Sequence, residues 1–367
     1  MNHGWEKYKL CEIGRIDFGK RIVAKDTIPG PYYVYGGGGA TFKSQEYNRE
    51  NCMIISRFAM SPECVRFVKG KFFLNDSGLS VKSICDRLNQ DFLDKYLWAN
   101  QSNIYNMGRG AAQRNLNTKA LADFYIQIPP IETQRQVAEE LDKINELIEV
   151  KRSQLADLDL LAQSLFYETF GDPITNSKGW EISKVAEILE TGSGGTPSKS
   201  VDEYWNSEEI PWIGSNMCQN KILYKTDGRF ISRLGLENSS AKLLEPDTIL
   251  IALVGATIGK VALIKIPTST NQNIGYIKPH KNIINPIFLF YTIQGLYSLF
   301  LEIGNGKFKM ANLSFIRNLP IILPPISLQN EFAIKIEAIE EQKKCIDSSL
   351  ADLQTLLASR MDYWFND

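Results

Sequence analysis

Apolar residues recur at spacings of three and four along two long stretches of the chain. The first stretch, from Gln134 to Phe170, contains neither proline nor glycine and begins four residues after a Pro-Pro pair. An average spacing of 3.5 residues is typical of a helix that packs along one face as a coiled coil. The pattern therefore predicts two long helices. The predicted apolar face carries Val137, Leu141, Ile144, Ile148, Leu155 and Leu158 in the first helix and Phe332, Ile336, Ile339, Ile346, Leu350 and Leu353 in the second.

The two stretches are copies of one another. Residues 128–170 align with residues 323–365 without a gap, and 15 of the 43 aligned positions are identical, among them Gln134 and Gln329. This similarity indicates an internal duplication, which is best recognised before any other feature is interpreted. Two similar helices can pack antiparallel about a pseudo-two-fold axis. The alternative is that each helix only caps the segment before it.

The segment before each helix mixes short β-branched runs with short helical patterns. Runs at 53–57 and 248–253 read as strands, and patterns at 92–99 and 286–300 read as helices. The fold class predicted is therefore α+β, with two mixed domains and two long antiparallel helices in an internal repeat. The expected boundaries are 1–130 for the first domain, 131–170 for the central helix, 171–326 for the second domain and 327–367 for the C-terminal helix.

Charge is distributed unevenly over these four segments, although the whole chain has a formal net charge of −1. The first domain carries 18 basic and 12 acidic side chains, a net of +6, and the second carries 15 and 13, a net of +2. The two helices have net charges of −5 and −4. A basic excess favours binding to a polyanion such as DNA, whereas an acidic helix suits a protein partner.

Several classes of protein do not fit the composition. The six cysteines contain no C-x-x-C pair and the chain has only two histidines, which argues against a disulfide framework, a zinc site or a histidine-based hydrolase. No apolar stretch approaches the roughly 18 residues of a membrane span, and the N-terminus does not resemble a signal peptide. We therefore expect a cytoplasmic protein without a metal site.

Motifs for chemistry on DNA are incomplete. Residues 285–288 read Asn-Pro-Ile-Phe and lack the second proline of the loop that holds a flipped base in adenine methyltransferases. Residues 255–261 resemble a phosphate-binding loop that is one residue short and has no hydroxyl for magnesium. The only [DE]-x-K strings lie in the predicted helices, where no nuclease site is expected. The chain is therefore predicted to be non-catalytic.

The order of domain, helix, domain and helix resembles the specificity (S) subunit of Type I restriction–modification systems. The resemblance rests on Ile-Pro-Pro-Ile-x-x-Gln and Leu-Pro-Pro-Ile-x-x-Gln before the helices, and on the markers at 210–213, 250–264 and 271–273. It implies two target recognition domains that read the two halves of a bipartite site in double-stranded DNA. It also implies that the helices form a spacer where methyltransferase (modification) subunits dock, two per chain, with restriction subunits joining through them.

The resemblance also implies that S-adenosylmethionine, ATP and magnesium belong to the partner subunits, with no cofactor in this chain. Two other classes remain open. One is an enzyme with a divergent methyltransferase or nuclease site. The other is a coiled-coil adaptor or decoy that binds no specific DNA sequence, which the charge distribution and the resemblance argue against.

Candidate DNA-binding residues are the basic and amide side chains of glycine-punctuated loops, because such side chains donate to phosphates and base edges. Residues 304–309 hold the same place before the second Pro-Pro pair as residues 108–114 before the first, which is the main positional argument. The candidates in the first domain are Lys20, Arg21, Arg57, Arg109, Gln113, Arg114 and Asn115. Those in the second are Ser198, Lys199, Ser215, Asn216, Gln219, Asn220, Lys221, Lys307 and Lys309.

Overall fold

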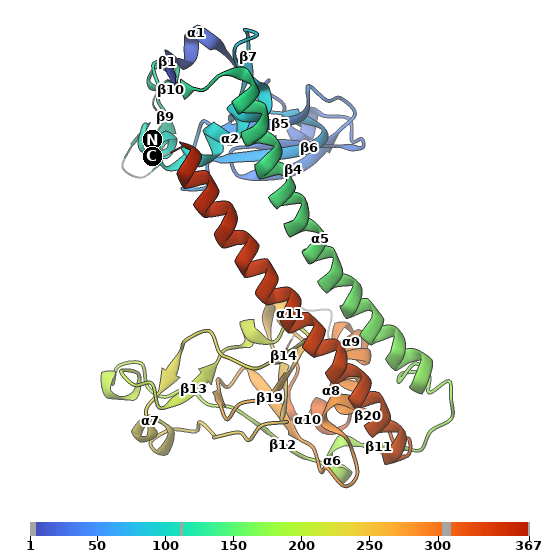
Figure 1. The fold of residues 1–367 in the computed structure, drawn as a ribbon. Coiled ribbons are helices and arrows are strands. Elements are labelled where there is room, and N and C mark those ends of the chain that lie inside the picture. The colour runs from blue at the N-terminus through green and yellow to red at the C-terminus, as the bar shows by residue number, and fades with distance from the viewer. Residues whose placement is uncertain (1–4, 111–112, 303–309, 366–367) are drawn as a thin grey trace. The chain divides into compact units, whose positions relative to one another are not determined.

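The computed structural model describes residues 5–110, 113–302 and 310–365. Two compact units are present: Met1–Arg152 together with Asp347–Asp367, and Ser153–Ile346. The long helices α5 (Ile131–Phe170, green in Figure 1) and α11 (Ile326–Phe365, red) each contribute residues to both units. Each helix has 40 residues, and their first residues lie 195 positions apart. The predicted pair of duplicated helices is therefore confirmed.

The first unit contains a six-stranded sheet in the order β2–β7–β5–β6–β3–β4, in which only β3 and β6 pair in parallel. A short β1–β10 pair lies outside this sheet, as does a β8–β9 pair. The strands are β1 (Glu6–Lys9), β2 (Gly14–Phe18), β3 (Tyr32–Gly36), β4 (Gly39–Ser44), β5 (Arg49–Ser56), β6 (Val65–Leu74), β7 (Gly78–Ser83), β8 (Gly108–Arg109), β9 (Asn115–Leu116) and β10 (Tyr125–Ile128). The shorter helices are α1 (Leu10–Ile13), η1 (Ala24–Asp26), α2 (Gln90–Ala99), α3 (Gln101–Asn106) and α4 (Thr118–Ala122).

The second unit has a five-stranded sheet in the order β12–β19–β16–β17–β14 and a three-stranded sheet in the order β15–β13–β18. Its strands are β11 (Ile182–Lys184), β12 (Glu190–Ser193), β13 (Ile210–Ile213), β14 (Lys221–Leu223), β15 (Phe230–Ile231), β16 (Ile249–Ala252), β17 (Val261–Ile264), β18 (Ser269–Thr270), β19 (Ile274–Lys278) and β20 (Pro320–Ile322). Its shorter helices are α6 (Val185–Ile188), η2 (Asp202–Tyr204), η3 (Ser215–Met217), α7 (Arg233–Glu237), η4 (Gly255–Thr257), α8 (Pro286–Gly295), α9 (Tyr297–Leu301) and α10 (Leu313–Arg317). The predicted helix at 286–300 is therefore interrupted at Leu296.

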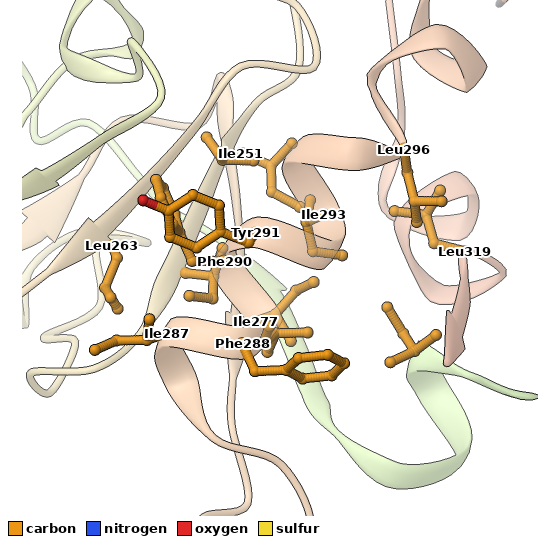
Figure 2. Packing of buried hydrophobic residues seen from close by; sticks show 14 of the residues in the cluster. Ile251, Leu263, Ile277, Ile287, Phe288, Phe290, Tyr291, Ile293, Leu296 and Leu319 are labelled. Carbon is orange, nitrogen blue, oxygen red and sulfur yellow. The ribbon is translucent and has the colours of Figure 1, made fainter. Parts of the chain in front are cut away.

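In the second unit, the core forms where helix α8 packs on the central strands of the larger sheet. Figure 2 shows side chains of α8 among those of Ile251, Leu263 and Ile277. These three strand side chains are fully buried. The end of α5 and the start of α11 complete this core, where Phe170 packs edge-on against Phe332 with ring centroids 5.3 Å apart. Both long helices are therefore part of the hydrophobic core that stabilises this unit.

The first unit uses the opposite ends of the same two helices. Val137 and Leu141 near the start of α5 are buried with Phe365 at the end of α11, whose ring lies 5.5 Å from that of Phe92 on α2. Arg360 of α11 forms an ion pair with Glu140 of α5. In the second unit, Lys343 of α11 pairs with Asp159 of α5 at 2.6 Å. In both units the two helices therefore run antiparallel.

The Pro-Pro-Ile-x-x-Gln motif has a structural explanation. The amide of Gln134 is buried at the start of α5, where its oxygen accepts from the backbone N–H of Asn89 at 2.8 Å. Its nitrogen donates to the carbonyls of Arg87 at 2.7 Å and Pro129 at 2.8 Å. Because Asn89 caps α2, this one glutamine fixes the start of the long helix to the start of α2.

The second copy repeats this arrangement. Gln329 is also fully buried, accepts from the backbone of Asn285 at 2.8 Å and donates to the carbonyl of Pro324 at 2.8 Å. Asn285 caps α8, as Asn89 caps α2. The duplication seen in the sequence is therefore a duplication of one hydrogen-bonded junction.

Across the described residues, none of the helices combines the length and apolar character that crossing a bilayer requires.

Candidate DNA interface

Arg57 directly follows strand β5, and backbone hydrogen bonds hold it on both sides. Its N–H donates to the carbonyl of Ser77 at 2.8 Å, and its carbonyl accepts from Leu116 of β9 at 2.8 Å. The next turn is held by Asn115, whose side-chain oxygen accepts from the N–H of Ala59 at 3.2 Å. Ala59 has a φ of +46°, a conformation that non-glycine residues rarely adopt. The loop Ser56–Met60 is therefore fixed against the β8–β9 hairpin.

The same hairpin carries Arg114, whose guanidinium lies over the ring of Tyr105 at 4.6 Å and donates to the carbonyl of Tyr105 at 3.3 Å. The carbonyl of Arg114 accepts from Met60 at 2.9 Å. Arg109 pairs with Asn115 in the β8–β9 ladder and is exposed, as is Gln113. Five candidates far apart in the sequence, Arg57, Arg109, Gln113, Arg114 and Asn115, are thus brought together on one hairpin and its neighbouring loop.

Lys20 and Arg21 lie close to the same place. The N–H of Lys20 donates to the carbonyl of Leu74 at 3.0 Å, so the segment that follows β2 runs beside the end of β6. The approach needs glycine at position 19, because a Cβ there would lie 1.9 Å from the carbonyl oxygen of Asn75. Phe18, the last residue of β2, contacts Arg57. The side chains of Lys20 and Arg21 are exposed beside Arg57 and its neighbours.

In the second unit, a chain of contacts links three of the candidates, Ser198, Asn216 and Gln219. Trp212 is buried and stacks edge-on against Trp205 with ring centroids 5.1 Å apart. The guanidinium of Arg229 lies 5.1 Å from the centre of the Trp212 ring and donates to the side-chain oxygen of Asn216 at 3.0 Å. On the other side, the indole N–H of Trp205 donates to the carbonyl of Ser198 at 3.1 Å. Ser198 and Asn216 therefore flank one aromatic cluster.

A second set of bonds extends this cluster. Gln219 donates to the carbonyl of Asn216 at 3.1 Å and accepts from the ammonium of Lys260 at 2.9 Å. Asn220 has a φ of +58°, and its side chain accepts from the N–H of Val261 at 3.0 Å. The side chain of Asn220 thus already has a structural role at the edge of β17. Lys199 follows Ser198, Ser215 begins η3 and Lys221 begins β14; Lys199 and Lys221 are exposed and Ser215 is half-buried.

Two cationic side chains of this cluster, Arg229 and Lys260, were not among the sequence candidates. Arg229 sits in an Asp-Gly-Arg turn and forms an ion pair with Asp227 at 2.5 Å, which holds the pKa of the Asp227 carboxyl below its usual range. The feature of the sequence that could have identified Arg229 is its place in a polar turn that contains glycine. A cavity of about 640 Å³ is lined by Trp205, Arg229 and their neighbours. Lys307 and Lys309 lie outside the described residues.

The predicted apolar face of the long helices is buried most deeply near the domains. Side chains buried in the cores are Val137, Leu141, Ile144, Ile148, Phe332, Ile336 and Ile339. Those that are only half-buried are Leu155, Leu158, Ile346, Leu350 and Leu353. Each helix therefore packs both on a domain and on the other helix, so the alternative of helices that only cap a domain is wrong.

The loop that follows β5 in the first unit and the loop that follows β16 in the second unit are equivalent in the duplication. Leu253 has the backbone bonds of Arg57: its N–H donates to the carbonyl of Asn273 at 2.9 Å and its carbonyl accepts from Ala311 at 2.9 Å. Two residues later, Gly255 has a φ of +74°, as Ala59 has a φ of +46°. The backbone is thus repeated, whereas the side chain at the first of these positions changes from arginine to leucine.

The family model for the Type I restriction modification DNA specificity domain matches residues 2–159 and 177–350, one match on each copy of the duplication. The chain belongs to this family. The specificity subunit of a type I restriction enzyme from Escherichia coli is 32% identical over 123 residues, and one from Methanocaldococcus jannaschii is 27% identical over 175 residues. These alignments cover 32% and 46% of this chain, and only 30% and 40% of the two relatives.

The whole architecture is also found in a solved structure. The S subunit of a type I restriction–modification system from M. genitalium aligns with a TM-score of 0.62 at 16% sequence identity, over 99% of this chain and 96% of that one. At this identity the similarity establishes the fold. The predicted architecture and the predicted family are both confirmed, whereas the DNA-binding residues remain predictions.

Proposed function

We propose that this chain is the non-catalytic specificity subunit of a Type I restriction–modification complex. Residues 1–130 and 171–326 each read one half of a bipartite target in double-stranded DNA. The observation that carries this proposal is the family match on both copies of a duplicated domain whose loops gather cationic and amide side chains. Such side chains supply phosphate contacts, which set position, and base-edge contacts, which read sequence.

The long helices scaffold the partner subunits in this proposal. Their exposed surface is acidic, as the net charges of −5 and −4 show, which disfavours DNA and suits protein. Because the junction around Gln134 is repeated around Gln329, two methyltransferase subunits dock on one chain, and restriction subunits join through them. S-adenosylmethionine, ATP and magnesium bind to those partners, and the complex acts in the cytoplasm.

The test is co-expression with the cognate methyltransferase, followed by sequencing of methylated bases in the host DNA. We expect one bipartite motif with a fixed gap, and exchange of residues 171–326 for those of a relative should change only one half of it. A stable complex that yields no motif would contradict DNA reading and leave a scaffold or decoy. Binding of S-adenosylmethionine by the purified chain alone would contradict the non-catalytic assignment.

A further inference from the structure

The guanidinium of Arg57 lies against two aromatic rings in the first unit. It lies 4.6 Å from the centre of the Phe18 ring and 4.9 Å from that of Phe58. One nitrogen donates to the carbonyl of Asp76 at 2.7 Å. These three contacts, together with the backbone bonds of Arg57, fix the plane of the guanidinium before any ligand arrives.

Arg57 has an incomplete set of partners for a half-buried arginine. Among the described residues, no carboxylate forms an ion pair with it, and the bond to Asp76 is the one side-chain hydrogen bond recorded. A guanidinium has five N–H donors. Most of the donors of Arg57 therefore remain for an acceptor outside the chain.

Three other arginines show what a satisfied guanidinium is like in this protein. Arg49 donates to the carbonyls of Asn48, Asp17 and Phe18 and to the hydroxyl of Ser80. Arg229 and Arg360 are paired with the carboxylates of Asp227 and Glu140. Arg49 thus ties strands together, and the other two are neutralised. Arg57 neither ties strands together nor is neutralised by a carboxylate, although it is half-buried.

We infer that Arg57 reads a guanine in the half-site recognised by the first domain, an inference that rests on the proposed DNA-reading function. Two acceptors, O6 and N7, line the major-groove edge of guanine and match two parallel N–H donors of one guanidinium. A stacked and pre-oriented guanidinium suits this planar, bidentate contact better than a flexible ammonium would. Phe18 and Phe58 are positioning residues for it.

The duplication supports a role in specificity. The equivalent residue of the second unit, Leu253, has the same backbone bonds and cannot donate a side-chain hydrogen bond. The scaffold of the loop is therefore kept without an arginine, so Arg57 is not required to build it. Two domains that read different half-sites should share their backbone and differ in the side chains that contact bases. The position of Arg57 and Leu253 has this pattern.

The test is the methylated motif produced in cells by the complete complex carrying Arg57→Ala or Arg57→Gln. For Arg57→Ala we expect the preference for guanine at one position of the first half-site to fall roughly 10- to 100-fold, with the second half-site unchanged. For Arg57→Gln we expect adenine to gain at that position, because glutamine pairs with N6 and N7 of adenine. Arg15→Ala is the control, since Arg15 is exposed in the same domain but paired with Asp17 at 2.8 Å.

Other outcomes would overturn the inference. An unchanged motif with lower overall methylation would make Arg57 a phosphate contact, and an unchanged motif with lower stability would make it a packing residue. Co-purification with the methyltransferase and an intact second half-site show that a variant has folded. If the wild-type complex itself produces no bipartite motif, the proposed function fails, whereas loss confined to the guanine position tests Arg57 alone.

Discussion

Helices α2 and α8 occupy the same place in the duplication and differ sharply in polarity. Each begins after an asparagine cap that is bonded to the buried glutamine of the following long helix. Three residues after the cap both have a buried phenylalanine, Phe92 or Phe288. Two residues further on, Asp94 in α2 corresponds to Phe290 in α8. A repeated backbone thus carries an ionisable group in one unit and an aromatic ring in the other.

The surroundings of the two helices explain this difference. In α8 every residue from Pro286 to Ile293 is buried. In the first unit a cavity of about 590 Å³ remains beside α2, lined by Asp94, Lys95, Trp98 and Phe67, among others, and Phe67 is 53% exposed. The residue of the second unit that corresponds to Phe67 is Leu263, which is fully buried. The comparison shows that α2 and α8 kept the same junction with the long helix that follows each of them. Their outer faces diverged together with the packing on that side.

The largest effect is expected from giving α8 the polarity of α2. Phe290→Asp removes a ring that is 2% exposed and buries a carboxyl group in an apolar core. The lost packing and the cost of the polar group should together destabilise the second unit by about 5 kcal/mol. Urea unfolding followed by hydrogen exchange in α8 measures this. Asp94→Phe should cost far less because a cavity adjoins the site, and equal losses would contradict the comparison.

The buried glutamines provide the next test. Gln134→Ala leaves the N–H of Asn89 and the carbonyls of Arg87 and Pro129 without their partner, at an expected cost of about 3 kcal/mol. Gln329→Ala should cost less, because one of its three bonds is long at 3.5 Å. Unfolding of each variant is compared with that of Gln136→Ala, an exposed position on the same helix. A neutral Gln134→Ala would mean that the junction tolerates water.

These tests show which features the sequence predicts. The spacing of apolar residues and the duplicated Pro-Pro-Ile-x-x-Gln motif predict both long helices, because both signals are local and strong. The role of Gln134 could not be predicted, since its partners Arg87 and Asn89 lie more than 40 residues earlier. The sequence also could not predict that Arg57 lies beside Arg114 and Asn115, because the pairing of β5 with distant segments determines this arrangement. Arg229 was missed because its turn contains an acid that cancels its charge.

The buried carboxyl of Asp94 should make the first unit sensitive to pH. Burial raises the pKa of Asp94 from 3.8 to about 6, although Gln90 donates a hydrogen bond to it at 2.7 Å. Between pH 4 and 6 the folded state then holds more protons than the unfolded state, so stability falls as the pH rises through this window. Asp94→Asn should remove this fall and be more stable than the wild type at pH 8 by about 2 kcal/mol.

Unfolding in urea at pH 4 and at pH 8 measures this effect. The variant and the wild type should converge at pH 4, where Asp94 is largely protonated. Asp86→Asn, which changes an exposed carboxyl shortly before the same helix, is the matched control. A wild type whose stability rises between pH 4 and 6 in a manner that depends on Asp94 would show that its carboxylate has a favourable partner instead. The second unit has Phe290 at this position and supplies no such group.

The smallest effects are expected at the arginines of the two candidate interfaces. Arg114 stacks on Tyr105 without an ion pair among the described residues, whereas Arg229 is neutralised by Asp227. In the assembled complex, Arg114→Ala should weaken DNA binding by about 1–3 kcal/mol if the side chain reads a base. Arg229→Ala should cost less, because breaking the pair with Asp227 offsets what the DNA contact supplies. Titration of labelled DNA at two salt concentrations separates the two cases: loss of a phosphate contact lowers the salt dependence of binding, whereas loss of a base contact changes the sequence preference. Equal losses for both variants would show that the ion pair with Asp227 opens when DNA binds.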